Sequence, residues 1–574
     1  MTSMPTAATI TVREALDLLD GPFASLAQGV AQRRYAFWLG SGISRSRVDD
    51  LRGVVARVLE HLRTNIDAGN PNCVYLAALV EAIELAHLSP GDRAQVDFAV
   101  PVSAWPVMAT VLTNLTRDYS RLLDIRVTGH PEADYLLWDV VDVPATFAAA
   151  DAIPDCEHLC LAILVLEGVV PDLPTANWDG LIEAAVDELT GASGAALRTC
   201  VVADDLREPP LLTRLLKFHG CAVRAANNPA AYRSLLIARY SQITDWPHND
   251  DYALMLRQLV DLAATKPTLM IGLSAQDVNI QFIFGEARAL MPWVWPSDPP
   301  AHVFAEDVLG PDQRNILRVV YRGAYDTNIP AIEASALFRA YAKPTLTALV
   351  LHVLCTKLRA FVQNVAAPLL NDGERTAVGH GIVRLRNRLA DAAEPDRLVF
   401  IKSFVRAASH AMSLFQEGTP AADQRYRPLG EVPLHRIAVA PDLATSGTRE
   451  LAAALGVIGL GDAAGHWTVD KADPNRPETG ALRLSSRSNT ARIFFAANDR
   501  AAVNLEINGL VRPDDPDAIV VHSIAPVPKM PRSPVAPPGR VGRPGLRNVA
   551  MAGLLREATT SDNLGARFRE EALL

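Results

Sequence analysis

Three short segments place glycine, amide, carboxylate and imidazole groups directly after apolar runs. They read LGSGIS at residues 39–44, TANWD at residues 175–179 and KFHG at residues 217–220. Glycine lets the main chain approach a ligand closely because it has no Cβ atom, and histidine accepts a proton near neutral pH. These residue types predict a pocket that holds a phosphorylated ligand beside a group for acid–base chemistry.

The glycine segment needs a strand before it and a helix after it. Residues 35–39 (YAFWL) are bulky and aromatic, which is typical of a buried strand in a parallel sheet. Apolar residues then recur at three- and four-residue spacing between Val48 and Ile66, which predicts one helix face. This succession brings backbone N–H groups and a helix N-terminus toward a pyrophosphate. Simple chain reversal at the glycines is the alternative interpretation.

The TANWD and KFHG segments also follow apolar runs. We expect a short strand from the run at residues 159–170 to deliver Asn177 and Asp179 to the carboxyl edge of the sheet, where ligands of open α/β folds bind. The alternative is that Asn177 or Asp179 caps a helix, which explains only one of the two polar residues. For His219, the alternative is a structural histidine. A segment that looks similar, LTNLTRD at residues 112–118, has its Asn and Asp two residues further apart, and we interpret it as surface.

Taken in order, the segments resemble the sirtuin family, with its GAGxS loop, its TxNxD segment and its Lys-hydrophobic-His-Gly histidine. A fourth match is TLMIGLSAQD at residues 268–277, which is similar to the late strand of that family ending in GxSxxD. The resemblance spans residues 35–306. There are two departures: Ser41 stands in the place of alanine, and Ala176 stands where threonine or glutamine is usual.

The resemblance implies an NAD pocket and a role for each matching residue. Asn177 would orient the attacking water and contact the carboxamide, Asp179 would bind the nicotinamide amide, and His219 would act as the base. Gly40, Ser41, Gly42 and Ser44 would cradle the pyrophosphate. The full set of NAD-binding residues would be Gly40, Ser41, Gly42, Ser44, Thr175, Gly272, Ser274 and Asp277, with Gly272 and Ser274 on the adenosine side.

The cysteines distinguish two subclasses of this family. Protein deacylases carry a zinc ribbon of two CxxC pairs, whereas the six cysteines of this chain form no CxxC pair. Cys156 and Cys160 fall on one helical face, which favours core packing over metal binding. The resemblance therefore points to the sirtuin-like effectors of prokaryotic antiviral defence, which need no metal and cleave NAD as substrate to nicotinamide and ADP-ribose. A protein deacylase or ADP-ribosyltransferase, or a non-catalytic subunit that binds NAD or ADP-ribose, are the alternatives.

Composition bounds the location and the partners. A chain of 574 residues is too long for a single hydrophobic core, so we expect two or three domains. The net charge of −9 argues against general nucleic-acid binding, so we expect any nucleic acid to act only indirectly. Residues 11–20 read as an acidic amphipathic helix rather than a signal peptide, and we expect no membrane span. These features predict a cytoplasmic protein.

The sequence predicts an α/β fold in three regions. Residues 1–330 would form a Rossmann-like parallel sheet with a helical small lobe at about 48–165, and residues 331–420 a helical region. In that region residues 341–361 read as a helix, with Pro344 in its first turn and a buried apolar stripe. Residues 421–574 would form a C-terminal α/β domain for sensing, assembly or partner docking. Its strands are expected at 481–485, 491–497, 502–507 and 518–524, after a linker at 416–433.

A basic, proline-rich segment at residues 526–547 is the least usual part of the C-terminal region. It carries Lys529, Arg532, Arg540, Arg543 and Arg547, and it reads either as a solvated linker or as a contact for an anion or a partner. The resemblance implies activity controlled by assembly. The expected assembly is a homo-oligomer, a complex with a defence partner (a short Argonaute, an ATPase or a nucleotide-processing protein), or both.

Overall fold

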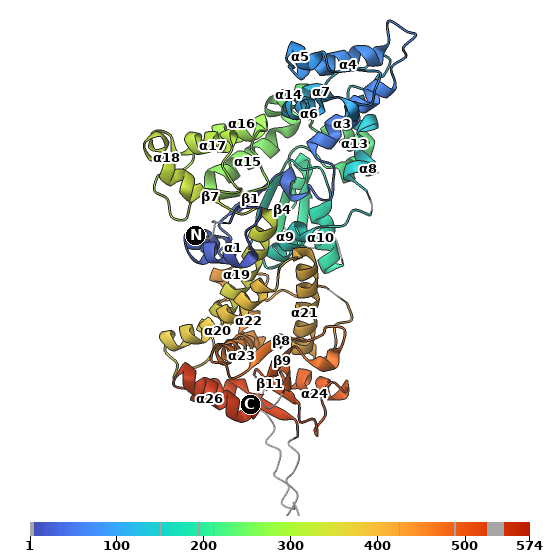
Figure 1. Ribbon diagram of the computed structural model, residues 1–574. Helices are drawn as coiled ribbons and strands as arrows, with labels where there is room; N and C mark the ends of the chain where they lie inside the picture. Colours follow the sequence, from blue (N-terminus) through green and yellow to red (C-terminus); the bar gives the residue numbers. More distant parts are fainter. Residues whose placement is uncertain are drawn as a thin grey trace, which may run out of the picture.

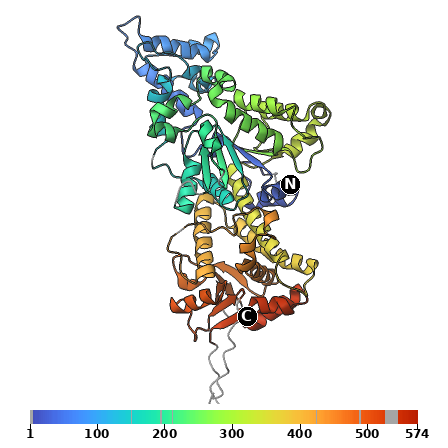
Figure 2. The same cartoon turned by 180° about the vertical axis from the view of Figure 1, so that it is seen from behind.

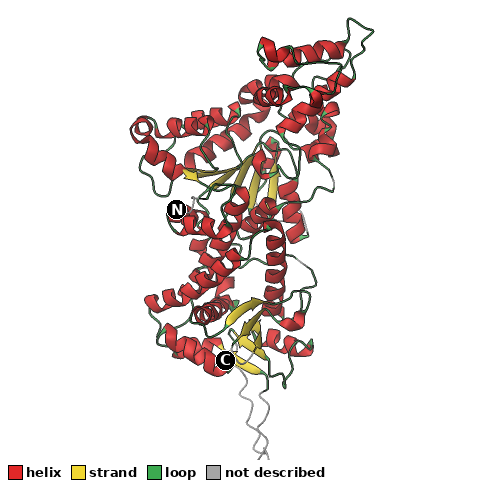
Figure 3. Cartoon of the chain, viewed as in Figure 1, coloured by secondary structure: helices red, strands yellow, loops and turns green. Residues whose placement is uncertain are grey.

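A computed structural model describes residues 5–149, 151–191, 196–209, 212–423, 425–486, 490–524 and 545–574. Two units that each contain a sheet lie along one long axis, with long helices between them (Figure 1). The view from behind shows the same arrangement, and helices surround both sheets (Figures 2 and 3). The predicted α/β class, with a parallel sheet, a helical region and a β-containing C-terminal region, is confirmed.

The N-terminal sheet has seven parallel strands in the order β3-β4-β2-β1-β5-β6-β7. Strand β1 lies between β2 and β5, so the strands that follow it in the chain are added on both of its sides. The position at β1 where the strand order reverses is the switch point of the sheet, and ligands of such sheets bind at the carboxyl ends of the strands beside it. All four predicted segments follow the carboxyl ends of strands near it. The strands are β1 (Ala36–Leu39), β2 (Asp172–Thr175), β3 (Leu197–Cys200), β4 (Thr213–Lys217), β5 (Thr268–Ile271), β6 (His302–Ala305) and β7 (Leu337–Phe338).

The expected helix-rich insertion stands above the carboxyl edge of this sheet (Figure 1). Its apolar faces form a core of their own, which also includes Ala222 and Ala225 of α12 (Ala222–Asn227), the helix that follows KFHG. The insertion is therefore packed against the site through α12. Its main helices are α3 (Leu51–Thr64), α4 (Val74–Leu85), α6 (Met108–Arg117), α7 (Tyr119–Leu123) and α8 (Val143–Phe147).

The apolar run before TANWD is a helix rather than a strand. Helix α9 (Cys156–Leu166) is buried at every position, and Asp155 caps its first turn. A continuous apolar run does not distinguish a buried helix from a buried strand, which explains the error, and the delivering strand is the next element, β2. Cys156 and Cys160 lie in the core beside Thr347, as predicted.

Three long helices connect the two sheets: α19 (Ala342–Gln363), α20 (Asp372–Asp391) and α21 (Arg397–Glu417). Pro344 lies in the first turn of α19, and the apolar stripe of this helix is buried in both cores, as predicted. By length and composition alone, α19 and α21 are long and apolar enough to cross a membrane. Within the protein, 72% of the most apolar window of α19 and 44% of that of α21 are buried, and core helices pass the same test.

The C-terminal sheet has the order β12-β11-β10-β9-β8, with the first three strands parallel and the others antiparallel. The strands expected near 481, 491 and 518 are present. The strand expected at 502–507 is wrong, because these residues belong to α24 (Asp499–Ile507), which Asn498 caps. The strands are β8 (Thr468–Lys471), β9 (Leu482–Ser485), β10 (Thr490–Ala496), β11 (Ala518–His522) and β12 (Arg547–Ala550).

Most of the basic segment, including Lys529, Arg532, Arg540 and Arg543, lies outside the described residues. Arg547 begins β12, where its side chain is buried and donates to the carbonyl oxygen of Ala572 at 2.9 Å. This arginine is therefore a structural residue rather than a surface contact.

The predicted linker at 416–433 is anchored to the N-terminal unit. Tyr426 Oη donates to Glu167 Oε1 at 2.7 Å, and the Leu429 N–H donates to the same oxygen at 3.0 Å. Lys357 Nζ of α19 lies 2.6 Å from Glu167 Oε2 and 2.6 Å from the Gly430 carbonyl oxygen. The linker thus shares a buried polar cluster with α9 and α19, and the domain boundaries at 330 and 420 stay predictions.

Candidate functional site

The predicted segments meet in one pocket between the carboxyl edge of the sheet and the helical insertion. Its volume is about 410 Å³. Gly42 and Thr175 are the two predicted site residues that do not line it. Those that do are Gly40, Ser41, Ser44, Asn177, Asp179, His219, Gly272, Ser274 and Asp277.

The glycine turn packs directly on the turn that follows β5. A Cβ atom at Gly40 would lie 2.3 Å from the Gly272 carbonyl oxygen, and one at Gly42 would lie 2.6 Å from Gly272 Cα. Gly272 itself has a φ of +62°. Larger residues would therefore force the two turns apart, so these glycines are required for packing between the turns.

The N–H groups of this turn are largely engaged within the protein. Backbone carbonyls accept hydrogen bonds from Gly40, Gly42, Ile43 and Ser44. The N-terminus of α3 is capped by Asp50, whose carboxylate accepts from the Gly53 N–H at 2.9 Å. Among residues 40–44, the N–H of the exposed Ser41 is therefore the one without a carbonyl partner. The assignment of the turn residues to NAD stays a prediction.

Hydrogen bonds within the protein fix the backbone of Asn177 and the nitrogen of its side-chain amide. Thr175 Oγ1 donates to the Leu39 carbonyl oxygen at 3.0 Å and accepts from the Asn177 N–H at 3.0 Å. Asn177 Nδ2 donates to the Gly40 carbonyl oxygen at 3.1 Å. The side-chain oxygen of Asn177 is left to accept a hydrogen bond from a molecule in the pocket.

Asp179 and Lys217 order the loop after β2. Asp179 Oδ1 accepts from the Leu181 N–H at 3.2 Å, so Asp179 caps the start of α10 (Leu181–Thr190) as well as lining the pocket. The buried Lys217 Nζ donates to the Asp179 carbonyl oxygen and lies 2.7 Å from Glu183 Oε1. Burial alone would lower the pKa of Lys217, but the negative charge of Glu183 raises it above its ordinary value. Lys217 is therefore a charged positioning residue.

His219 lies between two residues of the segment that follows β5. Its Nδ1 is 3.4 Å from Asp277 Oδ2, and its Nε2 is 3.1 Å from Asn279 Nδ2. Burial lowers the pKa of His219, and Asp277 opposes this shift only in part. At neutral pH the imidazole is therefore uncharged and able to accept a proton.

Asn279 was not predicted from the sequence. It is fully buried in the first turn of α16 (Val278–Ala287), and its Oδ1 has no hydrogen-bond partner among the described residues. Asp277 caps this helix by accepting from the Asn279 N–H at 2.8 Å. The signal available in the sequence was the Asp-x-Asn spacing that continues the GLSAQD segment.

The segment at 112–118 is partly a site element rather than surface. Asn114 donates to the Ala86 carbonyl oxygen at 2.8 Å and does not line the pocket, but Arg117 and Asp118 do. The end of α6 points into the pocket because the insertion folds over the sheet edge, which the sequence spacing does not show.

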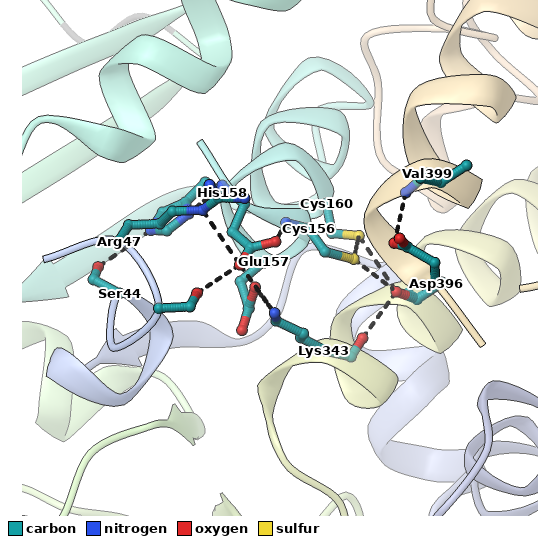
Figure 4. A network of polar contacts seen from close by, with 12 residues as sticks. Ser44, Arg47, Cys156, Glu157, His158, Cys160, Lys343, Asp396 and Val399 are labelled. Carbon is teal, nitrogen blue, oxygen red and sulfur yellow. Dashed lines mark hydrogen bonds and ion pairs between the residues drawn. The ribbon is translucent and has the colours of Figure 1, made fainter. Parts of the chain in front are cut away.

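A buried polar network supports the glycine turn from below (Figure 4). His158 Nδ1 accepts from the Asp155 N–H at 3.1 Å, so its Nε2 proton faces Ser44 Oγ at 3.2 Å. Burial lowers the pKa of His158 to about 4, which keeps it neutral. Lys343 Nζ of α19 lies 2.9 Å from Asp155 Oδ2. The turn is thus connected through α9 to the helical region.

The part of the chain that the structure describes contains no group of three or more His, Cys, Asp or Glu residues arranged to hold a metal ion. A family model described as SIR2-like domain matches residues 172–317. The match begins at β2 and includes TANWD, KFHG and GLSAQD. No curated protein matches the chain. With the parallel sheet and the common pocket, this match shows that the chain contains a sirtuin-like domain of an NAD-related family.

Proposed function

We propose that this chain is an NAD glycohydrolase that cleaves NAD to nicotinamide and ADP-ribose. The observation that carries the proposal is the neutral His219, which lines the same pocket as the open amide oxygen of Asn177. The volume of about 410 Å³ lies within the usual range for small-molecule sites.

The proposed reaction needs one water and releases one proton. The bond between ribose C1′ and the nicotinamide nitrogen breaks, and its electron pair leaves with the neutral nicotinamide. The water oxygen forms the new bond to C1′. Asn177 Oδ1 accepts a hydrogen bond from this water and orients it, because Nδ2 of the same amide is fixed on Gly40.

His219 would receive at Nε2 the proton that the water loses, once the Asn279 amide has turned away from this nitrogen to admit the water. Its Nδ1 proton faces the carboxylate of Asp277, which stabilises the imidazolium that forms. Asn279 can bind both protonation states of the imidazole. Its Nδ2 donates to Nε2 of the neutral ring, and after rotation of the amide its unpaired Oδ1 would accept from the Nε2 proton of the imidazolium. Asp179 would bind the nicotinamide amide.

We further infer a role in bacterial anti-phage defence, in which activation depletes NAD in the cytoplasm. The absence of a CxxC pair from the sequence supports an effector rather than a deacylase. The described part of the C-terminal unit contributes no residue to the pocket, so catalysis alone does not require it. We propose that it responds to a partner protein or to self-assembly, with α19 as the element shared by both cores.

The nature of the products tests this proposal. The full chain, assayed over a range of concentrations that promotes assembly, should release nicotinamide and ADP-ribose from NAD alone, as measured by liquid chromatography and mass spectrometry. Turnover only when an acetyl-lysine peptide is added, with acetylated ADP-ribose as product, would overturn the proposal in favour of a deacylase. Binding of ADP-ribose without turnover at any concentration would favour a non-catalytic subunit.

A further inference from the structure

The proposed substrate carries a pyrophosphate, and the glycine turn does not neutralise it. Four of the five turn N–H groups at residues 40–44 already have carbonyl partners, and the Asp50 carboxylate engages one N–H, that of Gly53, at the N-terminus of α3. A doubly charged group in this pocket therefore needs cationic side chains.

The charges that line the pocket fall into two classes. Two of the pocket carboxylates lie beside arginines: Asp49 pairs with Arg57, and Asp118 lies 3.9 Å from Arg121. Arg121 also lies over the ring of Tyr240, with its guanidinium carbon 4.8 Å from the ring centroid. These groups have partners before any ligand binds.

Two pocket arginines have no such partners. Arg45 directly follows the glycine turn, and Arg117 ends α6 in the insertion. Both side chains belong to exposed residues that line the pocket, and neither has a hydrogen bond or an ion pair within the described ranges. Arg45 interacts only electrostatically, with Glu306.

We propose that Arg45 and Arg117 clamp the pyrophosphate, one from the sheet and one from the insertion. Guanidinium groups bind phosphate oxygens in a bidentate manner, which gives orientation as well as charge. The insertion then contributes a binding group of its own. This inference rests on the proposed NAD function, because it assigns the part of that substrate that the glycine turn leaves unbound.

Calorimetry on the full chain tests the clamp with ADP-ribose, which carries the pyrophosphate and is not consumed. Arg45→Gln and Arg117→Gln should each weaken binding about 10- to 100-fold, the range for a lost hydrogen bond to a charged group. Arg117→Lys should restore part of the loss. Arg52→Gln, on the exposed side of α3 and outside the pocket, should bind like the wild type.

The outcomes separate the clamp from the function. If the wild type binds ADP-ribose and both glutamine variants bind within twofold of it, the clamp is wrong and the NAD site stands. If binding depends on both arginines but activated protein does not hydrolyse NAD, the clamp stands and the glycohydrolase proposal fails. If the folded wild type does not bind ADP-ribose, both fail. Thermal unfolding of each variant confirms that it is folded.

Discussion

His219 and Asn279 are 60 residues apart in the chain, and a 3.1 Å contact joins Nε2 of the imidazole to Nδ2 of the amide. The contact connects the segment that follows β4 to the first turn of α16. On the other side of the ring, Asp277 faces Nδ1. One short segment after β5 therefore faces both ring nitrogens of the proposed base, while burial keeps the ring uncharged.

Asn279→Asp should move the pH profile of NAD hydrolysis. A carboxylate beside Nε2 favours the imidazolium and raises the pKa of His219, so the acidic limb of kcat should shift upward by about one pH unit or more. Asn315→Asp adds the same charge at an exposed position of α17 (Pro311–Tyr321) and should leave the limb in place. An unmoved limb in Asn279→Asp would show that Asn279 does not act through the base.

His219→Ala should separate binding from turnover. A base acts mainly in the transition state, so kcat should fall by about 100-fold or more while the Kd for ADP-ribose changes little. Calorimetry and nicotinamide release on the same preparation measure the two effects. A proportional loss of both would make His219 a structural or ligand-binding residue instead.

Glu157→Gln should change how stability depends on pH. Burial raises the pKa of Glu157 from 4.5 to about 7, so the folded state holds a proton that the unfolded state loses between these values. The wild type therefore loses up to roughly 3 kcal/mol of stability as the pH rises through this window, and the variant does not. Denaturant unfolding at pH 5 and pH 8 measures the difference.

The matched control is Glu84→Gln, because the Glu84 side chain is 65% exposed. Its stability relative to the wild type should be the same at both pH values. If the stability difference between Glu157→Gln and the wild type is also the same at both pH values, Glu157 is ionised in the folded state at pH 5 and the prediction is wrong.

Lys357→Met should destabilise the chain strongly. The lysine and Glu167 are both buried, with side-chain exposures of 0% and 1%, so the variant leaves a buried carboxylate without its cation. The expected cost is about 3–5 kcal/mol, and Lys357→Met combined with Glu167→Gln should recover part of it, because the amide removes the buried charge and its oxygen still accepts from Tyr426 and Leu429. Lys402→Met breaks a half-exposed pair with Glu188 and should cost less than about 1 kcal/mol. A similar cost for both single variants would contradict the importance of the buried cluster.

The local parts of the site could be predicted from the sequence, and the parts formed by packing could not. Asn177, Asp179 and His219 each follow a strand within a few residues, so their arrival at one edge follows from a parallel sheet. Asn279 contacts His219 only because α16 packs beside it, and Arg117 lines the pocket only because the insertion folds over the sheet edge. The Asp-x-Asn spacing marks the start of a helix at Asn279, but it does not indicate either contact.

Two segments show why element type was harder to predict than position. Residues 502–507 (AVNLEI) alternate as a strand would, but the Asn498 cap and the burial of Ala501 and Leu505, four residues apart, make a helix. Residues 159–166 are apolar at every position, and the whole of α9 is buried because it lies between the sheet and α19. Burial on every face removes the periodicity that distinguishes a helix from a strand.

Release of nicotinamide by Asn177→Ala tests the central claim most directly. Asn177 is proposed to hold the attacking water, so its loss should lower kcat by at least 100- to 1,000-fold, as when one preorganised polar group is removed. Asn114→Ala, an equal truncation outside the pocket lining, should keep most of the activity. The account predicts that activated wild type and Asn114→Ala release nicotinamide and that Asn177→Ala does not. Equal release by Asn177→Ala and the wild type would contradict it.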